Sequence, residues 1–353
     1  MPLLYPPGST GAELLEGLLV FPRCSISRRT HQVVKLLDEI IEEGTAEGVS
    51  PYCASRFYLL TRDLLTLHLT LTPIKHGQHL KKLPQASLIY HNDCLFLADH
   101  LIRTVGPTVR VGVSTKFGDK RLVLESEVSY IDLAAQFRNS GMEVFNNQLM
   151  AQKTHILELI SSTNGLGMGD DARALEVQKM LSQVMYSTRQ VISVWAPPMS
   201  PVAFHKKLIC ALAGWIISAV TVEILSAIDI ADEESHRLNE MMHKLERSCT
   251  LLFVGDSDEP SSTEYEEGQA LLRRHVGVEF TKYRKLKEMM VMSFAGIMDL
   301  FRGGRGDGFL HDEEEGGLNE FSGEELCGLV RALFSDTPLR QKNLAEIREM
   351  RGM

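Results

Sequence analysis

The sequence feature that most constrains the fold is a long run of helix-forming residues, LPQASLIYHNDCLFLADHLIRTV, at positions 83–105. Pro84 suits the first turn of a helix, because a proline there gives up only an amide that would lack a partner. Two apolar stripes recur at helical spacing and leave a narrow polar band. The stripes comprise Leu88, Leu95, Ala98 and Ile102 on one side and Tyr90, Cys94, Leu97 and Leu101 on the other. This pattern predicts a helix that packs on more than one side.

The same helix contains HNDCLFLADH, which is rich in residue types that ligate metals. A metal-dependent helical hydrolase that uses His91, Asp93, Asp99 and His100 is therefore an alternative hypothesis. The spacing argues against it, because ligands on one helix normally stand three or four residues apart. His91 and His100 are separated by about 900° of helical rotation, and Asp93 lies roughly 10 Å along the axis from His100. A buried helix with a polar seam is favoured, with Asp99 and Arg103 as an ordinary ion pair.

Composition argues against several classes of function. With 37 basic and 46 acidic residues the net charge is −9, so the surface as a whole does not favour nucleic acid.

The six cysteines form no CxxC pair, which fits reduced thiols in a cytosolic compartment better than a zinc ribbon or a disulfide framework. The N-terminus lacks a secretory signal pattern. No nucleophile–base pair, phosphate loop or cofactor signature is found, and we expect no enzymatic activity, cofactor or metal.

The most apolar stretch, LICALAGWIISAVTVEILSAIDI, begins at Leu208. Its uninterrupted part ends at Glu223 after about fifteen residues, which is short of the roughly twenty needed to span a bilayer. We therefore expect a helix buried on all sides within a bundle. An adaptor that touches membranes through residues 208–226 is the alternative.

Helical periodicity continues through most of the chain. Pro51 is predicted to begin a helix that ends at Pro73, and a break is expected near Ser140 and Gly141. A single long helix is predicted over 269–302. The apolar stripe of the helix after Pro51 comprises Phe57, Leu60, Leu64, Leu67 and Leu71.

Turn and cap signals complete the pattern. Between Gly106 and Glu127, two β-branched runs flank FGDK, which predicts either a hairpin or an extended loop and is the only β signal. The segment NGLGMGDD lacks the third glycine of a dinucleotide-binding loop, and we interpret it as a turn with Asp171 capping the next helix. Ser322 and Glu325 form a capping box that opens a helix with Leu326, Leu329, Val330 and Leu333 on its inner face.

These elements predict an all-α fold. About ten helices with short connections are expected, with at most one small β-hairpin. We divide the chain into a lead-in at residues 1–20, a first helical bundle at 21–165 and a second, C-terminal bundle at 166–353. Two flexible acidic loops are expected within the second bundle, at 255–269 and 303–320.

Five ordered blocks resemble the C-terminal part of the zeste-white ten family and together span roughly residues 21–350. The blocks are FPRCSIS, CASRFYLLTRDLL, LPQASLIYHNDCLFLADHL, YIDLAAQFRNSGMEVFNNQLMAQKTHILELIS and LVRALFSDTPLRQKNLAEI. None is a catalytic motif. The most distinctive block is the predicted helix that contains HNDC, at residues 83–101. The resemblance implies an elongated stack of helical bundles, as in other multisubunit tethering complexes.

The resemblance also implies a function. The family and its fungal Dsl relatives are known at the endoplasmic reticulum (ER), where they capture coatomer-coated vesicles returning from the Golgi and promote fusion through ER SNAREs. In animals the family also joins rod and zwilch at the kinetochore, where it helps recruit dynein and checkpoint proteins. We therefore expect a non-enzymatic subunit of a vesicle-tethering complex for Golgi-to-ER retrograde transport, cytoplasmic and peripheral at the ER membrane. The kinetochore role is the alternative.

The expected partners follow from the same resemblance. The family's C-terminal bundles are where a large helical solenoid subunit, of the Sec or rod type, is expected to bind. The family's N-terminal coiled region, which meets the SNARE-bound RINT or Tip type of subunit, is expected to lie outside this chain. The yeast relatives bind coatomer through an acidic segment with tryptophans, whereas the acidic loops here contain none. Coatomer is therefore a partner implied by the resemblance alone.

The last two predicted helices carry the candidate partner-binding residues Arg331, Phe334 and Arg340. A basic end that bears an aromatic side chain suits a protein interface. The alternative is that Phe334 packs within the terminal bundle.

Overall fold

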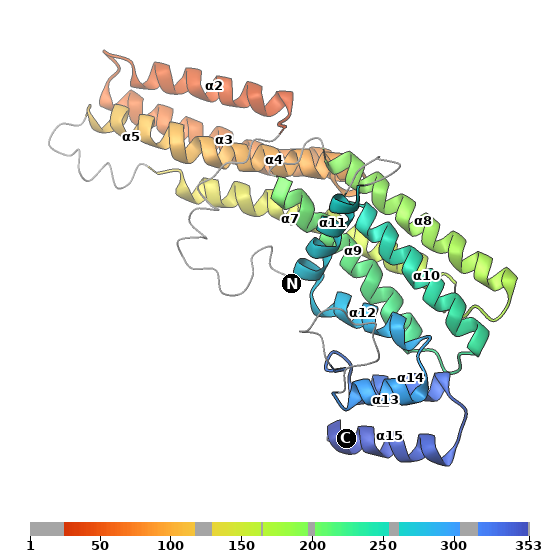
Figure 1. Ribbon diagram of the computed structural model, residues 1–353. Coiled ribbons are helices and arrows are strands. Elements are labelled where there is room, and N and C mark those ends of the chain that lie inside the picture. The colour runs from red at the N-terminus through yellow and green to blue at the C-terminus, as the bar shows by residue number, and fades with distance from the viewer. Residues whose placement is uncertain are drawn as a thin grey trace. The chain divides into compact units, whose positions relative to one another are not determined.

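The structure is a computed structural model that describes residues 25–116, 129–163, 165–196, 202–253, 261–303 and 317–351. Within those ranges it is all-α and contains no strand, as the sequence predicts (Figure 1). Its elements are α2 (Arg28–Thr45), α3 (Pro51–Lys82), α4 (Pro84–His100), a π-helical turn η1 (Leu101–Val105), α5 (Gly106–Ser114), α7 (Ile131–Ser161), α8 (Asp171–Trp195), α9 (Val202–Leu225), α10 (Asp232–Leu251), α11 (Ser262–Val276), α12 (Val278–Met289), α13 (Phe294–Phe301), α14 (Gly323–Leu333) and α15 (Pro338–Arg351).

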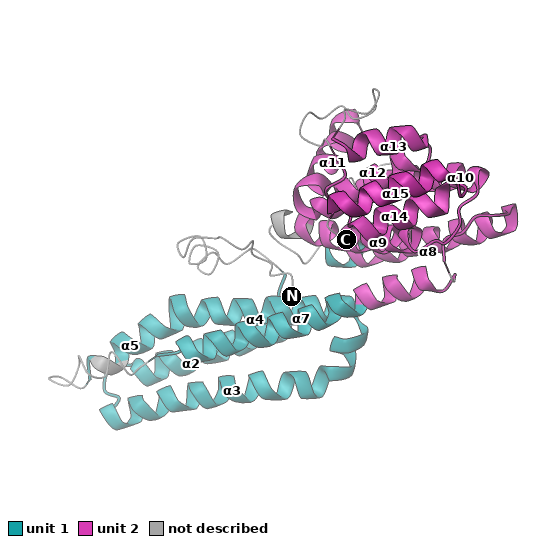
Figure 2. Ribbon diagram, turned by 90° about the horizontal axis from the view of Figure 1, so that it is seen from below, with its two compact units in different colours: residues 1–151, 193–204 teal, residues 152–192, 205–353 magenta. Residues whose placement is uncertain are grey.

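The chain divides into two compact units, which Figure 2 shows in different colours. Unit 1 comprises Met1–Ala151 and Ser193–Phe204, and unit 2 comprises Gln152–Ile192 and His205–Met353. Because α7 begins in unit 1 and ends in unit 2, and α8 returns the chain to unit 1, these two helices belong to both units.

The predicted organising helix, α4, is buried on more than one side within unit 1. It begins at Pro84, as expected, and both of its stripes contribute buried residues. Trp195, at the end of α8, is fully buried. Its indole N–H donates to the Pro84 carbonyl oxygen at 2.8 Å, and its ring lies 5.5 Å from that of Phe145 in α7. This aromatic contact connects α4, α7 and α8.

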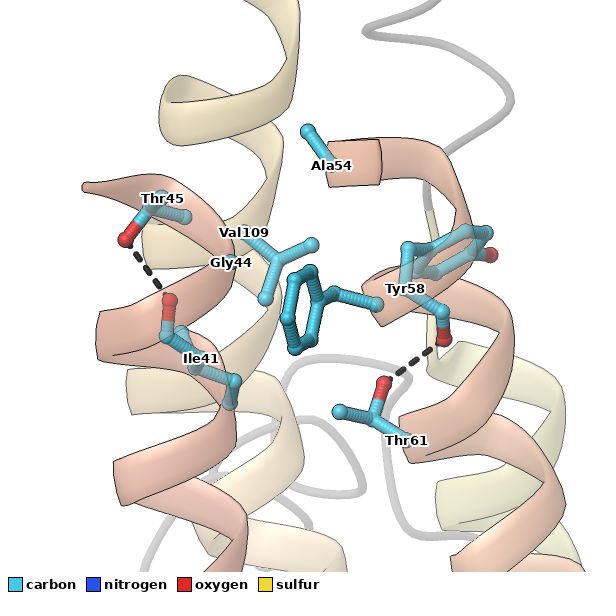
Figure 3. Close-up of a pocket in the computed structure, with 8 residues that line it drawn as sticks. Ile41, Gly44, Thr45, Ala54, Tyr58, Thr61 and Val109 are labelled. Atoms are coloured by element: carbon cyan, nitrogen blue, oxygen red, sulfur yellow. Dashed lines mark hydrogen bonds between the residues drawn. The ribbon is translucent and has the colours of Figure 1, made fainter. Parts of the chain in front are cut away.

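The predicted hairpin between residues 106 and 127 is wrong in the part that the structure describes, because Gly106–Ser114 is the helix α5. The second β-branched run lies outside the described residues. Val109 is buried against α2 and α3 (Figure 3), and a Cβ built at Gly112 would lie 2.2 Å from Cγ2 of Thr45. Tertiary packing on α2 therefore overrides the β propensity of this segment. The cavity at this junction, about 10 Å³, has room for at most one water.

Two predicted helix ends inside unit 1 are also wrong. Helix α3 continues through Pro73 to Lys82, although a proline inside a helix removes one backbone hydrogen bond. Leu80, beyond the proline, is buried. Helix α7 runs unbroken through Gly141. A Cβ at Gly141 would lie 2.7 Å from the Cβ of Cys94, so the glycine provides a close approach of α7 to α4 rather than a break.

Helix α9 supplies the core of unit 2. Its residues Lys206–Leu225 are long and apolar enough to cross a membrane by length and composition, with a mean hydropathy of 2.2. In the structure Ile216, Ile217 and Val220 are fully buried among the other helices of the unit. Helix α9 is therefore a core helix of unit 2, but Val222 is 61% exposed, so the helix is not buried on all sides as the sequence predicted.

The single long helix predicted over 269–302 is three helices, α11, α12 and α13. Gly277 ends α11 with a φ of 63°, a conformation that other residues rarely adopt. Ser293 then caps α13 by accepting a hydrogen bond from the Gly296 amide. These two residues give the chain tight turns that the apolar periodicity did not reveal.

The predicted acidic loops are shorter than expected where the structure describes them. Ser261 and Glu264 form a capping box, so 262–269 is helical and belongs to α11. At the other loop, Lys285 binds the Gly317 carbonyl oxygen and the Glu320 carboxylate, each at 2.8 Å. Residues 254–260 and 304–316 lie outside the described residues.

Helix α8 is capped by a different residue from the one predicted. The carboxylate of Asp170 accepts from the Arg173 amide at 2.7 Å, whereas Asp171 pairs with Arg237 of α10 at 2.9 Å. A cavity of about 350 Å³ lies beside this ion pair, between α8 and α10.

Candidate partner-binding site at the end of α14

The capping box predicted at Ser322 is confirmed and fixes where α14 begins. The Ser322 hydroxyl accepts from the Glu325 amide at 3.2 Å, and the Glu325 carboxylate accepts from the Ser322 amide at 2.8 Å. Leu326, Leu329 and Val330 are buried on the inner face, as predicted. The helix ends at Phe334, whose backbone is extended and whose amide donates to the Val330 carbonyl oxygen.

Arg340 closes the turn from α14 to α15. Its Nη1 donates to the carbonyl oxygens of Arg331, at 3.3 Å, and of Phe334, and its Nη2 pairs with Asp336 at 2.8 Å. Carbonyl groups at a helix C-terminus lack partners within the helix, so a guanidinium there stabilises the end of α14. The side chain of Arg340 is only 14% exposed, and its role in the structure is to position the turn.

Phe334 and Arg331 lie at the same turn. The ring of Phe334 is half-buried against Phe294 of α13, with ring centroids 5.1 Å apart. Part of this side chain therefore packs within the bundle, as the alternative hypothesis for Phe334 predicts. Arg331 is exposed. The structure thus brings the three predicted residues together, with Arg331 outward, Phe334 at the edge of the core and Arg340 beneath them.

Sequence reasoning missed two apolar residues at this end of the helix. The Ile230 amide donates to the Ala332 carbonyl oxygen at 2.9 Å, which fixes the loop between α9 and α10 beside the end of α14. In that loop Ile228 is 92% exposed, and Leu339 in the first turn of α15 is 61% exposed. We call Ile228, Arg331, Phe334 and Leu339 the end-of-α14 surface. The available signal was the pair of isoleucines in the loop segment SAIDIADE, of which Ile228 is exposed and Ile230 is buried.

The four residues of the metal hypothesis do not converge. His91 is buried and stacks on Phe145 with centroids 5.3 Å apart, and Asp93 accepts from the Ser27 amide at 2.7 Å. His100 instead pairs with Asp38 of α2 at 2.9 Å. Asp99 pairs with Arg103 at 2.8 Å, as predicted. Among the residues that the structure describes, no group of three His, Cys, Asp or Glu side chains could hold an ion.

Burial explains the electrostatics of this helix. Desolvation lowers the pKa of His91 to about 4, although a hydrogen bond with the Gly141 backbone opposes the shift. Desolvation likewise raises the pKa of the Asp93 carboxyl, although hydrogen bonds from Ser27 and Thr30 oppose the shift. The Cys94 thiol has its pKa raised to about 12 by burial, which makes it an unreactive core residue. The HNDC helix therefore uses its polar residues for packing.

Comparison with known proteins decides the family. The family model described as "Centromere/kinetochore protein zw10, C-terminal" matches residues 19–158, and the model described as "ZW10 C-terminal helical domain" matches residues 179–347. The chain belongs to the zw10 family. The blocks that suggested this resemblance lie within or beside the two matched ranges.

Zw10 relatives from distant organisms match nearly the whole chain. The zw10 homologue of Mus musculus is 28% identical over 93% of this chain and 39% of its own length. The homologue of Arabidopsis thaliana is 25% identical over 93% of this chain and 41% of its own length, and the zw10 protein of Drosophila melanogaster is 23% identical over 98% and 42%. The chain thus spans about two fifths of the length of these relatives.

Proposed function

We propose that this chain is a non-enzymatic docking part of an ER-membrane vesicle-tethering complex for Golgi-to-ER retrograde transport. In this proposal its end-of-α14 surface binds the large helical solenoid subunit of the complex. The supporting observation is the exposure of Ile228, Arg331 and Leu339 in segments that hydrogen bonds bring together at the end of α14. The buried core of a protein interface is more apolar than the rest of the surface, and aromatic and arginine side chains are enriched there.

The three predicted residues take different parts in this proposal. Arg331 is exposed and supplies a charged rim contact, and Phe334 supplies an apolar edge. Arg340 acts through the turn that it holds, because its guanidinium is committed to carbonyl oxygens of α14 and to Asp336. A partner-binding test therefore uses the two exposed apolar residues rather than Arg340, whose replacement would disturb the turn.

A kinetochore complex is the second candidate. It is favoured by the names of the relatives, each of which is a centromere/kinetochore protein zw10 or its homologue. The same surface would then dock the rod type of solenoid, and a chain that served both complexes would use one helical partner class in both. The SNARE-bound subunit and coatomer would associate through other parts of the complex.

Affinity isolation from the native cell tests the proposal. The tagged wild-type chain is expected to co-purify with a large solenoid subunit and ER SNAREs. Ile228→Asp and Leu339→Asp are each expected to reduce recovery of the solenoid by about tenfold or more, because a buried interface does not accept an unpaired carboxylate.

Val278→Asp is the matched control, since Val278 is 63% exposed in the same unit, at the start of α12. Equal loss in the control and in Leu339→Asp, or undiminished binding in all variants, would place the interface elsewhere. Recovery of rod, zwilch and checkpoint proteins without ER SNAREs would favour the kinetochore candidate instead.

A further inference from the structure

Helix α3 presents an apolar stripe to solvent on the side away from its own unit. Leu60, Leu67, Leu71 and Ile74 are 51, 53, 50 and 78% exposed, and Leu64 between them is half-buried. We call these five residues the α3 stripe. In Figure 2, α3 forms one edge of unit 1, with α2, α4, α5 and α7 all to the same side of it.

The stripe is not the face that α3 uses within unit 1. The face that packs on the rest of the unit carries Ala54, Thr61 and Leu65, all of them buried. At 100° per residue, Thr61 and Leu65 lie about 100° and 140° around the helix from Leu60. Helix α3 therefore has two apolar faces. Phe57 of the sequence-predicted stripe packs on Gly44 of α2, and the other four residues of that stripe lie on the face that the described residues leave uncovered.

The spacing of the stripe is that of a coiled-coil seam. Its residues follow each other at intervals of four, three, four and three, which is the a and d pattern of the heptad repeat. They fall within about 40° of one line on the helix and extend for roughly 21 Å along its axis. This regular, narrow seam matches the groove of another α-helix.

Positive charge follows the seam at its C-terminal end. Lys75, Lys81 and Lys82 are exposed there, and Arg29 of α2 lies against α3, with its Nη1 2.8 Å from Nε2 of His76. The sequence contains no aspartate or glutamate between residues 63 and 93. The chain as a whole has a net charge of −9, so this basic patch is a local exception. It favours a negatively charged occupant of the seam.

We propose that the α3 stripe is the docking site for an amphipathic, acidic α-helix of a partner protein. This helix packs its own leucines against the stripe and places Asp or Glu side chains beside Lys75, Lys81 and Lys82. The site lies in unit 1 and is separate from the end-of-α14 surface in unit 2.

Charge and width disfavour the other occupants. In a parallel pair of α3 helices the two basic ends would repel each other, and in an antiparallel pair Lys81 and Lys82 would approach Arg56 of the second copy. A membrane surface suits a wide apolar face, whereas this stripe is bordered along one side by the exposed polar residues Asp63 and Thr70. A narrow seam with a basic end fits one acidic helix.

A pair of synthetic peptides tests the proposal on the intact chain. Both peptides have about four heptads with leucine at a and d, and they carry either glutamate or lysine at e and g. Fluorescence anisotropy is expected to show the acidic peptide binding at least about tenfold more tightly than the basic one. Leu67→Gln and Ile74→Gln are each expected to weaken binding of the acidic peptide by about tenfold.

Ile131→Gln is the matched control, because Ile131 is 66% exposed in the same unit but lies on α7, and it is expected to leave binding unchanged. The charge reversal Lys75→Glu with Lys82→Glu is expected to invert the preference between the peptides. This arm does not depend on altering any apolar residue of the fold.

Several results would overturn the proposal. They are equal binding of the two peptides, no binding of either, or binding insensitive to Leu67→Gln. A dimer in sedimentation velocity that Leu67→Gln dissociates would make a second copy the occupant. Flotation with phosphatidylserine vesicles that Leu67→Gln abolishes would identify a membrane as the occupant of the α3 stripe.

Discussion

The buried ion pair between Glu246 of α10 and Lys287 of α12 provides a direct test of what stabilises unit 2. The side chains are 6% and 8% exposed, and the Lys287 ammonium donates to Oε2 of the carboxylate. Asn239 fixes the same region by donating to the Lys287 carbonyl oxygen at 2.6 Å. Two charges at this depth gain stability from each other only while both are present.

Lys287→Met leaves the Glu246 carboxylate buried, with a weak hydrogen bond at 3.4 Å from Gln269 in place of a charged partner. We expect the free energy of unfolding to fall by about 3–5 kcal/mol. Glu246→Gln leaves the ammonium unpaired and is expected to cost a similar amount. The double variant retains no buried charge, and we expect it to be more stable than either single variant.

Urea unfolding followed by far-UV circular dichroism gives the three free energies. Hydrogen exchange in peptides of α10 and α12 assigns the loss to unit 2. Glu346→Gln is the control, because it breaks a solvent-exposed pair, Arg302 with Glu346, and should change stability little. Additive losses in the double variant, or a loss from Lys287→Met as small as that of the control, would refute the idea that the pair is desolvated.

Three further predictions concern α4 of unit 1 and its contacts, and the first is compared with a glycine of α14 in unit 2. Gly141→Ala is expected to destabilise the chain by about 1–3 kcal/mol, because the added Cβ clashes with α4. At Gly328 an added Cβ meets nothing within 4 Å, and Gly328→Ala is expected to stabilise the chain by about 1 kcal/mol. Thermal melts compare the two variants. Because the folded-state pKa of His91 is about 4 against 6.5 for the free side chain, the unfolded state binds the proton first, and stability is lost as pH falls below 6.5. Urea titrations should show roughly 2 kcal/mol lost through this group between pH 7 and pH 5, and a loss that persists in His91→Gln would assign it to other groups. Trp195→Phe removes the donor to Pro84 and leaves a void, at a cost of about 2–4 kcal/mol, and full stability in this variant would show that the contact is dispensable.

The sequence determined the fold class and most of the helices, because helical periodicity, caps and prolines act over a few residues. The organising helix from Pro84, the capping box at Ser322 and the core position of the helix through Ile216 all follow from local pattern. The same local pattern singled out Arg331, Phe334 and Arg340 at the end of α14, and their role in partner binding stays a prediction.

Only the tertiary structure decided what each pattern is used for. Gly141 was interpreted as a break and is a close contact between α7 and α4. Arg340 holds the turn after α14, and its role in partner binding stays a prediction. Most tellingly, the leucines at 60, 67 and 71 were expected to form the stripe of their helix, and they face solvent. A periodic stripe indicates that one face of a helix is apolar. The element that covers this face is distant in the chain or belongs to another molecule, and its identity depends on which surfaces fit together.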